Sequence, residues 1–169
     1  EDGGFFSPSH YPVQSMSTLT THDMPTLIGY WHCLDLELGK DLGLYPTEEI
    51  LSTLYASRHE NKQSILDTLH GHGSVDDSVG RDVEYTGMTE ALNFGLQTHM
   101  ATGSSALLSL QLEDWLQMDK PVNIPGTFDE YPNWKRKLNR NLEDIFTDDK
   151  LTGLAGRLTQ ARRDASTDK

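Results

Sequence analysis

The apolar run SALLSLQL at residues 105–112 constrains the fold more than any other stretch of the chain. It has the length and composition of a buried strand, and strands of this kind belong to parallel sheets. Residues 13–20 form a second candidate strand, because they are rich in β-branched and apolar side chains and follow Pro12. We therefore predict an α/β chain with two short strands separated by helices.

Helical patterns occupy most of the remaining chain. Pro25 suits the first turn of a helix that extends to Leu34, and Thr47 with the two acids after it resembles a helix N-terminus. Glycines predict the end of this second helix near residue 71. Further helices are predicted from Thr89 to Met100, at residues 133–146 and at residues 151–163.

Residues 71–87 are rich in Gly, Ser and Asp and poor in large apolar side chains, so we expect an exposed loop there. The chain opens on EDGGFF without an initiator methionine, and Phe5 and Phe6 have the character of side chains that are buried. We expect a fragment of something longer. Glu1 and Asp2, at a frayed end, are poor candidates for catalytic groups.

Composition excludes several classes of protein. With 169 residues, 36% of them hydrophobic, the chain is long enough for one ordinary core. A net charge of −12 argues against nucleic acid and anionic membranes as partners. Cys33 is the only cysteine, which excludes an intramolecular disulfide and fits a reducing cytosol. No segment resembles a membrane span or a signal peptide, so we expect a cytoplasmic protein.

Polar residues follow each predicted strand directly. His22 and Asp23 come after the first strand, and Glu113 and Asp114 come after the second. In barrels of alternating strands and helices, the C-terminal ends of the strands build the active site. The alternative is structural, because an acid in a turn before a helix often serves only as a cap or in the first helical turn. Position alone leaves both interpretations open for these residues.

Five motifs, taken together, resemble a known family. THDMPTLIGYW, LGLYP, LLSLQLEDWLQM, PVNIPGT and YPNWKRKL occur here in the order, and at about the spacing, found in bacterial amylomaltases, the 4-α-glucanotransferases of glycoside hydrolase family 77. The similarity extends from about Phe6 to the final helix, and only the loop at 71–87 lacks a clear counterpart. The resemblance implies that residues 1–169 are the C-terminal part of a (β/α)8 TIM-type barrel, from strand seven to the final helix.

The same resemblance implies a role for the His-Asp pair. Asp23 corresponds to the third carboxylate of the family, which holds sugar hydroxyls in the donor subsite and favours the oxocarbenium-like ring, and His22 would bind the same sugar. Such contacts stabilise the transition state by several kcal/mol in this reaction class. The implied reaction is the retaining transfer of α-1,4-glucan segments between maltodextrins. Its nucleophilic Asp and acid/base Glu lie upstream, outside this chain.

The loop after the second strand supplies the remaining candidate residues. By the resemblance, Asn123 is a candidate partner for a sugar hydroxyl, and Tyr131 and Trp134 could provide flat apolar surfaces on which a glucose ring stacks. Helical spacing and flanking leucines predict core packing for Trp31 and Trp115 instead. We expect no cofactor.

Two other classes of protein stay open. A metal phosphohydrolase of the HD type also uses an adjacent His and Asp, but on a helix and with further ligands, and bound manganese, iron or zinc would identify it. His70 and His72 lack a third ligand at useful spacing, so we expect no metal site there. A non-catalytic helical interaction module is the other alternative, and binding of maltose or acarbose would distinguish it from a transferase.

Overall fold

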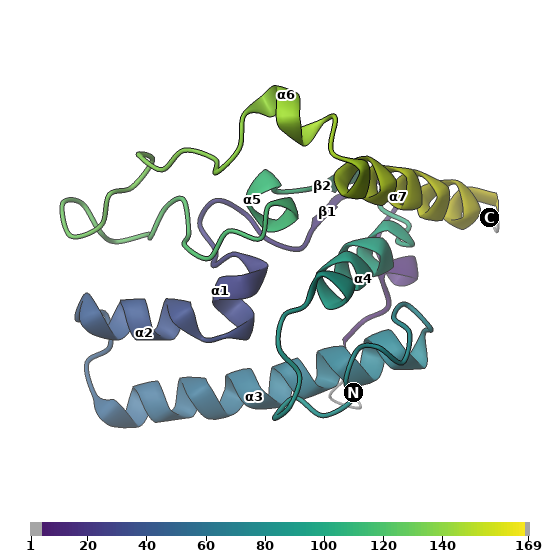
Figure 1. The fold of residues 1–169 in the computed structure, drawn as a ribbon. Helices are drawn as coiled ribbons and strands as arrows, with labels where there is room; N and C mark the ends of the chain where they lie inside the picture. Colours follow the sequence, from purple (N-terminus) through teal and green to yellow (C-terminus); the bar gives the residue numbers. More distant parts are fainter. Residues whose placement is uncertain (1–4, 168–169) are drawn as a thin grey trace.

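The computed structural model describes residues 5–167 and is mostly helical (Figure 1). Glu1 and Asp2 lie outside the described residues. In chain order the elements are η1 (Pro8–His10), β1 (Met16–Thr18), α1 (Leu27–Trp31), α2 (Leu34–Asp41), α3 (Glu48–Gly71), α4 (Glu90–Ala101), β2 (Leu107–Ser109), α5 (Leu112–Trp115), α6 (Leu142–Ile145) and α7 (Asp149–Thr167).

The two strands pair in parallel, which confirms the expected α/β character. Met16 lies opposite Leu107, and Thr18 lies opposite Ser109. The prediction of a buried second strand was wrong, because Leu107 is exposed and β2 is only three residues long. Within the described chain each strand has a hydrogen-bonded partner along one edge only.

Three helices begin at a threonine whose hydroxyl accepts a hydrogen bond from the backbone N–H three residues later. Thr47 and Thr89 do so as predicted, at the starts of α3 and α4. The third is Thr26, which caps α1, so Pro25 precedes the cap instead of lying in the first helical turn. The helix predicted to reach Leu34 ends earlier, because Cys33 adopts a left-handed backbone conformation (φ 59°) that separates α1 from α2.

The helix predicted at residues 133–146 is largely wrong, since only Leu142–Ile145 is helical. Two local features oppose a helix there. The amide of Asn133 accepts from the backbone N–H of Ile124 and donates to Thr127, so it closes a loop. Trp134 has a φ of 62°, which a right-handed helix cannot accommodate. The last helix, predicted at 151–163, is present and longer, as α7.

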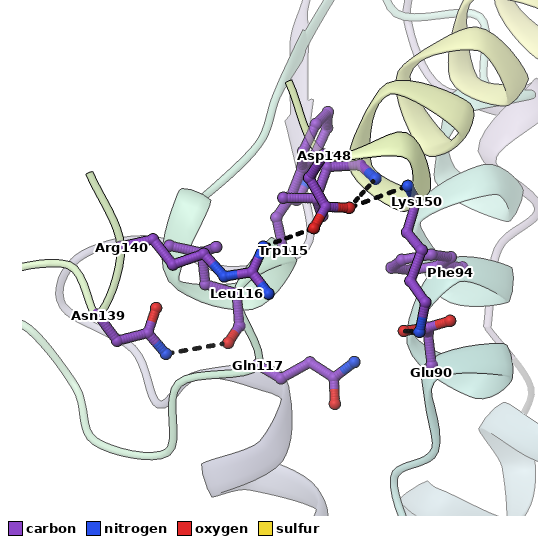
Figure 2. Close-up of a pocket in the computed structure, with 10 residues that line it drawn as sticks. Glu90, Phe94, Trp115, Leu116, Gln117, Asn139, Arg140, Asp148 and Lys150 are labelled. Carbon is purple, nitrogen blue, oxygen red and sulfur yellow. Dashed lines mark hydrogen bonds and ion pairs between the residues drawn. The ribbon is translucent and has the colours of Figure 1, made fainter. Parts of the chain in front are cut away.

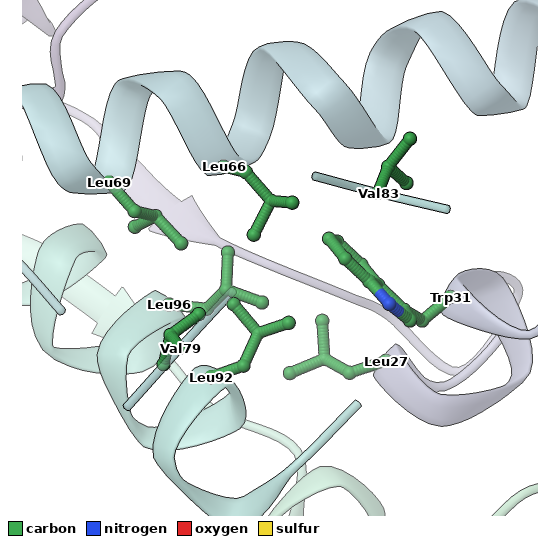
Figure 3. Packing of buried hydrophobic residues seen from close by; sticks show 8 residues of the cluster. All are labelled: Leu27, Trp31, Leu66, Leu69, Val79, Val83, Leu92 and Leu96. Carbon is green, nitrogen blue, oxygen red and sulfur yellow. The ribbon is translucent and has the colours of Figure 1, made fainter. Parts of the chain in front are cut away.

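Two apolar clusters form the core, and α4 contributes to both. Figure 3 shows the first, in which α3 packs across α1 and α4; it consists of Leu27, Trp31, Leu66, Leu69, Val79, Val83, Leu92 and Leu96. The second lies between α4, α6 and α7 and consists of Phe94, Ala101, Ile145, Leu151, Leu154 and Leu158. The core role predicted for Trp31 is confirmed.

Two sequence expectations about exposure need correction. The segment at 72–89 has no helix or strand, but Val79 and Val83 are buried in the first cluster, so the loop predicted at 71–87 is not exposed throughout. Val75 and Met88 pack against the same cluster, whereas Tyr85 is exposed. Phe5 and Phe6 are exposed, not buried.

No helix within residues 5–167 is long and apolar enough to cross a membrane.

Candidate functional site

His22 and Asp23 lie in a turn between β1 and α1, and neither is in a helix. The backbone N–H of Met24 donates to the carbonyl of Thr21 at 3.1 Å, which closes the turn. Thr26 supplies the cap of α1. Asp23 therefore does not serve as the helix cap that the sequence left open.

The two side chains are about half exposed and face each other. His22 Nε2 lies 3.4 Å from Asp23 Oδ2. A carboxylate in this setting keeps lone pairs open to solvent, and the imidazole beside it can offer an N–H. The pair can therefore both accept hydrogen bonds from a hydroxyl-rich ligand and donate to it.

Asn123 comes from the loop after β2 and reaches the same turn from 100 positions away. Its side-chain amide donates to Asp23 Oδ1 at 2.7 Å, and its backbone N–H donates to the His22 carbonyl at 3.1 Å. The loop thus holds both the side chain of Asp23 and the backbone of the preceding residue. The structure brings together three of the residues singled out in the sequence.

Trp134 is the fourth residue at this position. Its ring centroid lies 5.0 Å from that of His22, with the two planes tilted by 45°. The backbone N–H of Trp134 donates to the Val122 carbonyl at 3.0 Å, and 63% of the residue is exposed. An indole held by its backbone but open to solvent offers a flat apolar surface next to polar groups.

Tyr131 does not join this group. Only 8% of the residue is exposed, and its hydroxyl donates to the Pro121 carbonyl at 2.6 Å. Burial raises the pKa of this phenol. The ring is buried and therefore offers no open face to a sugar.

A pocket of about 140 Å³ lies beside Asp23 and Asn123. Its opposite wall includes Tyr45, Leu38 and Gly39. A Cβ on Gly39 would lie 2.5 Å from the Tyr45 hydroxyl, so this glycine allows the tyrosine to pack against α2. Sequence reasoning assigned no role to Tyr45. Its presence in the LGLYP motif could have indicated that it lies near the site.

A separate pocket of about 320 Å³ lies between α4, α5 and α7 (Figure 2). Arg140 pairs with Asp148 at 2.6 Å, and Lys150 pairs with Glu90 at 3.1 Å, so its four charged groups are matched. Trp115, predicted to pack in the core, lies partly buried at its edge and packs against the second cluster. The pocket contains none of the site residues predicted from the sequence.

Groups of three or more His, Cys, Asp or Glu side chains that could hold a metal ion are absent from the described part of the chain. The His-Asp pair also differs in setting from that of a metal phosphohydrolase, because it lies in a turn after a strand and not on a helix.

Comparison with known proteins decides between the classes left open. A profile of glycoside hydrolase family 77, described as 4-alpha-glucanotransferase, matches residues 1–143. The chain belongs to this family. Its membership removes the phosphohydrolase and the helical interaction module as classes for the chain, and it agrees with the resemblance seen in the five motifs.

Individual family 77 relatives give the same result. The chain is 35% identical over 161 residues to the 4-alpha-glucanotransferase of Haemophilus influenzae, which covers 95% of the chain and 23% of the relative. It is 34% identical over 148 residues to that of Mycobacterium bovis, covering 83% of the chain and 19% of the relative. The chain therefore spans less than a quarter of the length of these 4-alpha-glucanotransferases.

A solved family structure also matches. The crystal structure of amylomaltase from Corynebacterium glutamicum superimposes with a TM-score of 0.74 at 26% identity, over 94% of the chain and 23% of that structure. The arrangement of helices around the parallel strand pair is thus shared with an amylomaltase.

Proposed function

We propose that this chain is the C-terminal part of a 4-alpha-glucanotransferase barrel and carries its third carboxylate, Asp23. The full protein would break an α-1,4 bond in a maltodextrin, hold the glycosyl unit on a nucleophilic aspartate, and pass it to the 4-hydroxyl of another glucan. The nucleophile and the acid/base would come from the part of the enzyme that this chain does not contain. β1 and β2 would be the seventh and eighth barrel strands.

The hydrogen bond from Asn123 to Asp23 is the observation that carries the proposal. It fixes one oxygen of a half-exposed carboxylate at 2.7 Å and leaves the other near His22. A carboxylate held in this way can bind sugar hydroxyls with little reorganisation when the ring flattens. Contacts that tighten as the ring approaches an oxocarbenium ion lower the barrier, whereas uniform binding would not.

The neighbouring residues fit the binding of a sugar. His22 can donate to the same hydroxyls, and the exposed indole of Trp134 beside it can cover the apolar face of a glucose ring. Asn123 would accept a hydrogen bond from a sugar hydroxyl with its side-chain amide oxygen, which takes no part in the bond to Asp23. Tyr131 would act only by supporting the loop from below, because its hydroxyl is already bonded to Pro121. A cytoplasmic location belongs to the same proposal, and a single cysteine is compatible with it.

The test is the substitution Asp23→Asn in the full-length enzyme. Glucose release from maltotriose should fall by about a thousandfold or more, because the neutral amide no longer supports the developing positive charge. The melting temperature should change little, since Asp23 is half exposed. Asp41→Asn, at an exposed position at the end of α2, is the matched control and should keep full activity.

An active and well-folded Asp23→Asn enzyme would refute the role of Asp23. The 169-residue chain alone is expected to release no glucose above a mock preparation. Activity of that chain alone would show that the nucleophile and the acid/base lie within it. Stoichiometric bound manganese, iron or zinc would count against the transferase mechanism altogether.

A further inference from the structure

Asp114 is a buried carboxylate that accepts a hydrogen bond from the first backbone N–H of α1, a donor that has no partner within its own helix. It lies in the first turn of α5, directly after β2, and only 4% of the residue is exposed. Burial raises its pKa, while hydrogen bonds from Thr20 and Leu27 oppose that shift. No lysine or arginine pairs with it among residues 5–167. Burying an unpaired carboxylate costs several kcal/mol, so its hydrogen bonds must be specific.

Those hydrogen bonds join the two ends of one segment. Asp114 Oδ2 accepts from the hydroxyl of Thr20, just after β1, and Oδ1 accepts from the backbone N–H of Leu27 at 2.7 Å, at the start of α1. The segment between these two residues contains His22 and Asp23. One carboxylate therefore sets the separation between the end of β1 and the start of α1.

The backbone of Asp114 is in turn bound by a side chain of α4. The amide of Asn93 donates to the Asp114 carbonyl at 2.9 Å, and the amide of Gln97 donates to Asn93 Oδ1 at 2.7 Å. Asn93 and Gln97 are almost completely buried. This buried chain of hydrogen bonds restrains its members, because breaking one of its bonds would leave a further polar group without a partner, beside the Gln97 amide oxygen that already has none.

The His22–Asp23 turn is thus held on two sides by residues that follow β2. Asn123 contacts it directly, whereas Asp114 holds its two ends. The strands contribute little to this support, because each is three residues long. Positioning to within a fraction of an ångström matters for a transition-state contact, and a displacement of 1 Å can cost about a hundredfold in rate.

We propose that Asp114 is a positioning residue of the transferase: it places Asp23 through Thr20 and Leu27 and does not touch the sugar. This inference rests on the proposed function of Asp23. It predicts that loss of Asp114 matters for turnover only while Asp23 is present to be placed.

The experiment is a double-mutant cycle in the full-length enzyme, with Asp23→Asn, Asp114→Asn and the double variant. Asp114→Asn should lower kcat by about ten- to a hundredfold and change KM by less than about threefold. The double variant should be no slower than Asp23→Asn alone, within about threefold, because both changes remove the same contact. A role limited to stability would lower the melting temperature without this coupling.

α6 provides a matched control. It has the same Leu-Glu-Asp start as α5, and Asp144 occupies the position of Asp114 but is exposed to solvent. Asp144→Asn should leave kcat and KM unchanged. If Asp114→Asn fails to fold, Thr20→Val replaces it in the same cycle, since it removes one of the two bonds and keeps the shape of the side chain.

The outcomes separate the two proposals. If Asp23→Asn retains activity, the proposed function of Asp23 fails. If Asp23→Asn is inactive but Asp114→Asn keeps a normal kcat, or the two losses multiply in the double variant, the positioning role of Asp114 fails while the function of Asp23 stands.

Discussion

His99, near the end of α4, illustrates how local packing determines the chemistry of one side chain. Its Nδ1 lies 2.7 Å from the Ser74 hydroxyl, and its ring centroid lies 5.2 Å from that of His72. Burial lowers the pKa of His99, and the nearby charge of His72 lowers it further. The folded protein therefore binds a proton here less readily than the unfolded chain does.

This shift predicts a pH dependence of stability. The unfolded chain takes up a proton near the ordinary histidine pKa of 6.5, whereas the folded chain takes it up only at lower pH. Stability should therefore fall as the pH is lowered from about 7.5 to about 5.5, above the range where carboxylates titrate. His99→Gln should reduce this slope in urea unfolding, and His10→Gln, at an exposed site, should not. An unchanged slope in His99→Gln would contradict the prediction.

The candidate site shows which residues sequence reasoning can and cannot find. The place of Asp23 after a strand made it a candidate but left a helix cap equally open, and only the family resemblance assigned it a role. Asn123 was found only through the family resemblance, since no local pattern encodes a contact across 100 positions. Tyr131 shows that residue type alone does not identify a binding residue. A tyrosine in a polar loop is a reasonable candidate for binding a sugar, but here the side chain is buried and its hydroxyl donates to the Pro121 carbonyl.

At the level of elements, Arg58 connects α3 to α1 and α2. Its guanidinium donates to both carboxylate oxygens of Asp35 at 2.8 Å and to the Tyr30 carbonyl at 2.7 Å, and it lies 3.8 Å from the centre of the Tyr30 ring. The ion pair is mostly shielded from solvent. One side chain thus links three helices, and it also holds Asp35 at the wall of the pocket beside Asp23.

Removal of this arginine should be costly. Arg58→Met would leave the mostly shielded Asp35 without its ion-pair partner, and we expect the free energy of unfolding to fall by about 3 kcal/mol. Arg81→Met is the control, because its pair with Asp77 is largely exposed and should contribute less than about 1 kcal/mol. Equal losses in the two variants, measured by urea unfolding, would show that the shielding of Arg58 has no energetic importance.

Element boundaries were predictable where a cap residue marks them and unpredictable where a single backbone angle decides. The starts of α3 and α4 follow from threonine caps. The break between α1 and α2 depends on the left-handed conformation of Cys33, a conformation for which cysteine has no special preference. The left-handed conformation of Trp134 likewise prevents a helix from starting at residue 133. The residues next to it include no glycine that would have indicated such a conformation.

Across the whole molecule, α4 lies between α3 and α7 (Figure 1) and contributes side chains to both apolar clusters. α3 covers the first cluster, and α7 covers the second. The two strands are less well covered, since Leu107 and Met16 are exposed. An apolar pattern predicts that a strand will be covered, but Met16 and Leu107 lie opposite each other in the register and both are exposed, so one face of the strand pair is uncovered within residues 5–167.

The first cluster should account for much of the stability. Leu66 is fully buried between α3 and α4, so Leu66→Ala should lower the free energy of unfolding by about 3 kcal/mol, through lost burial and the cavity that remains. Leu54→Ala is the matched control on the same helix, where the side chain is partly exposed, and should cost about 1 kcal/mol or less. A smaller loss for Leu66 than for Leu54 would contradict the assignment of the core.

The long sequence separations around the His22–Asp23 turn have a consequence for the order of folding. Thr20 and Asp114 are 94 positions apart, and Asp23 and Asn123 are 100 positions apart. The backbone bonds of α3 close within a few residues and can form in about a microsecond, whereas the distant contacts form only after two large loops have closed. We therefore expect the turn that carries the candidate site to become ordered late, after the helices that surround it.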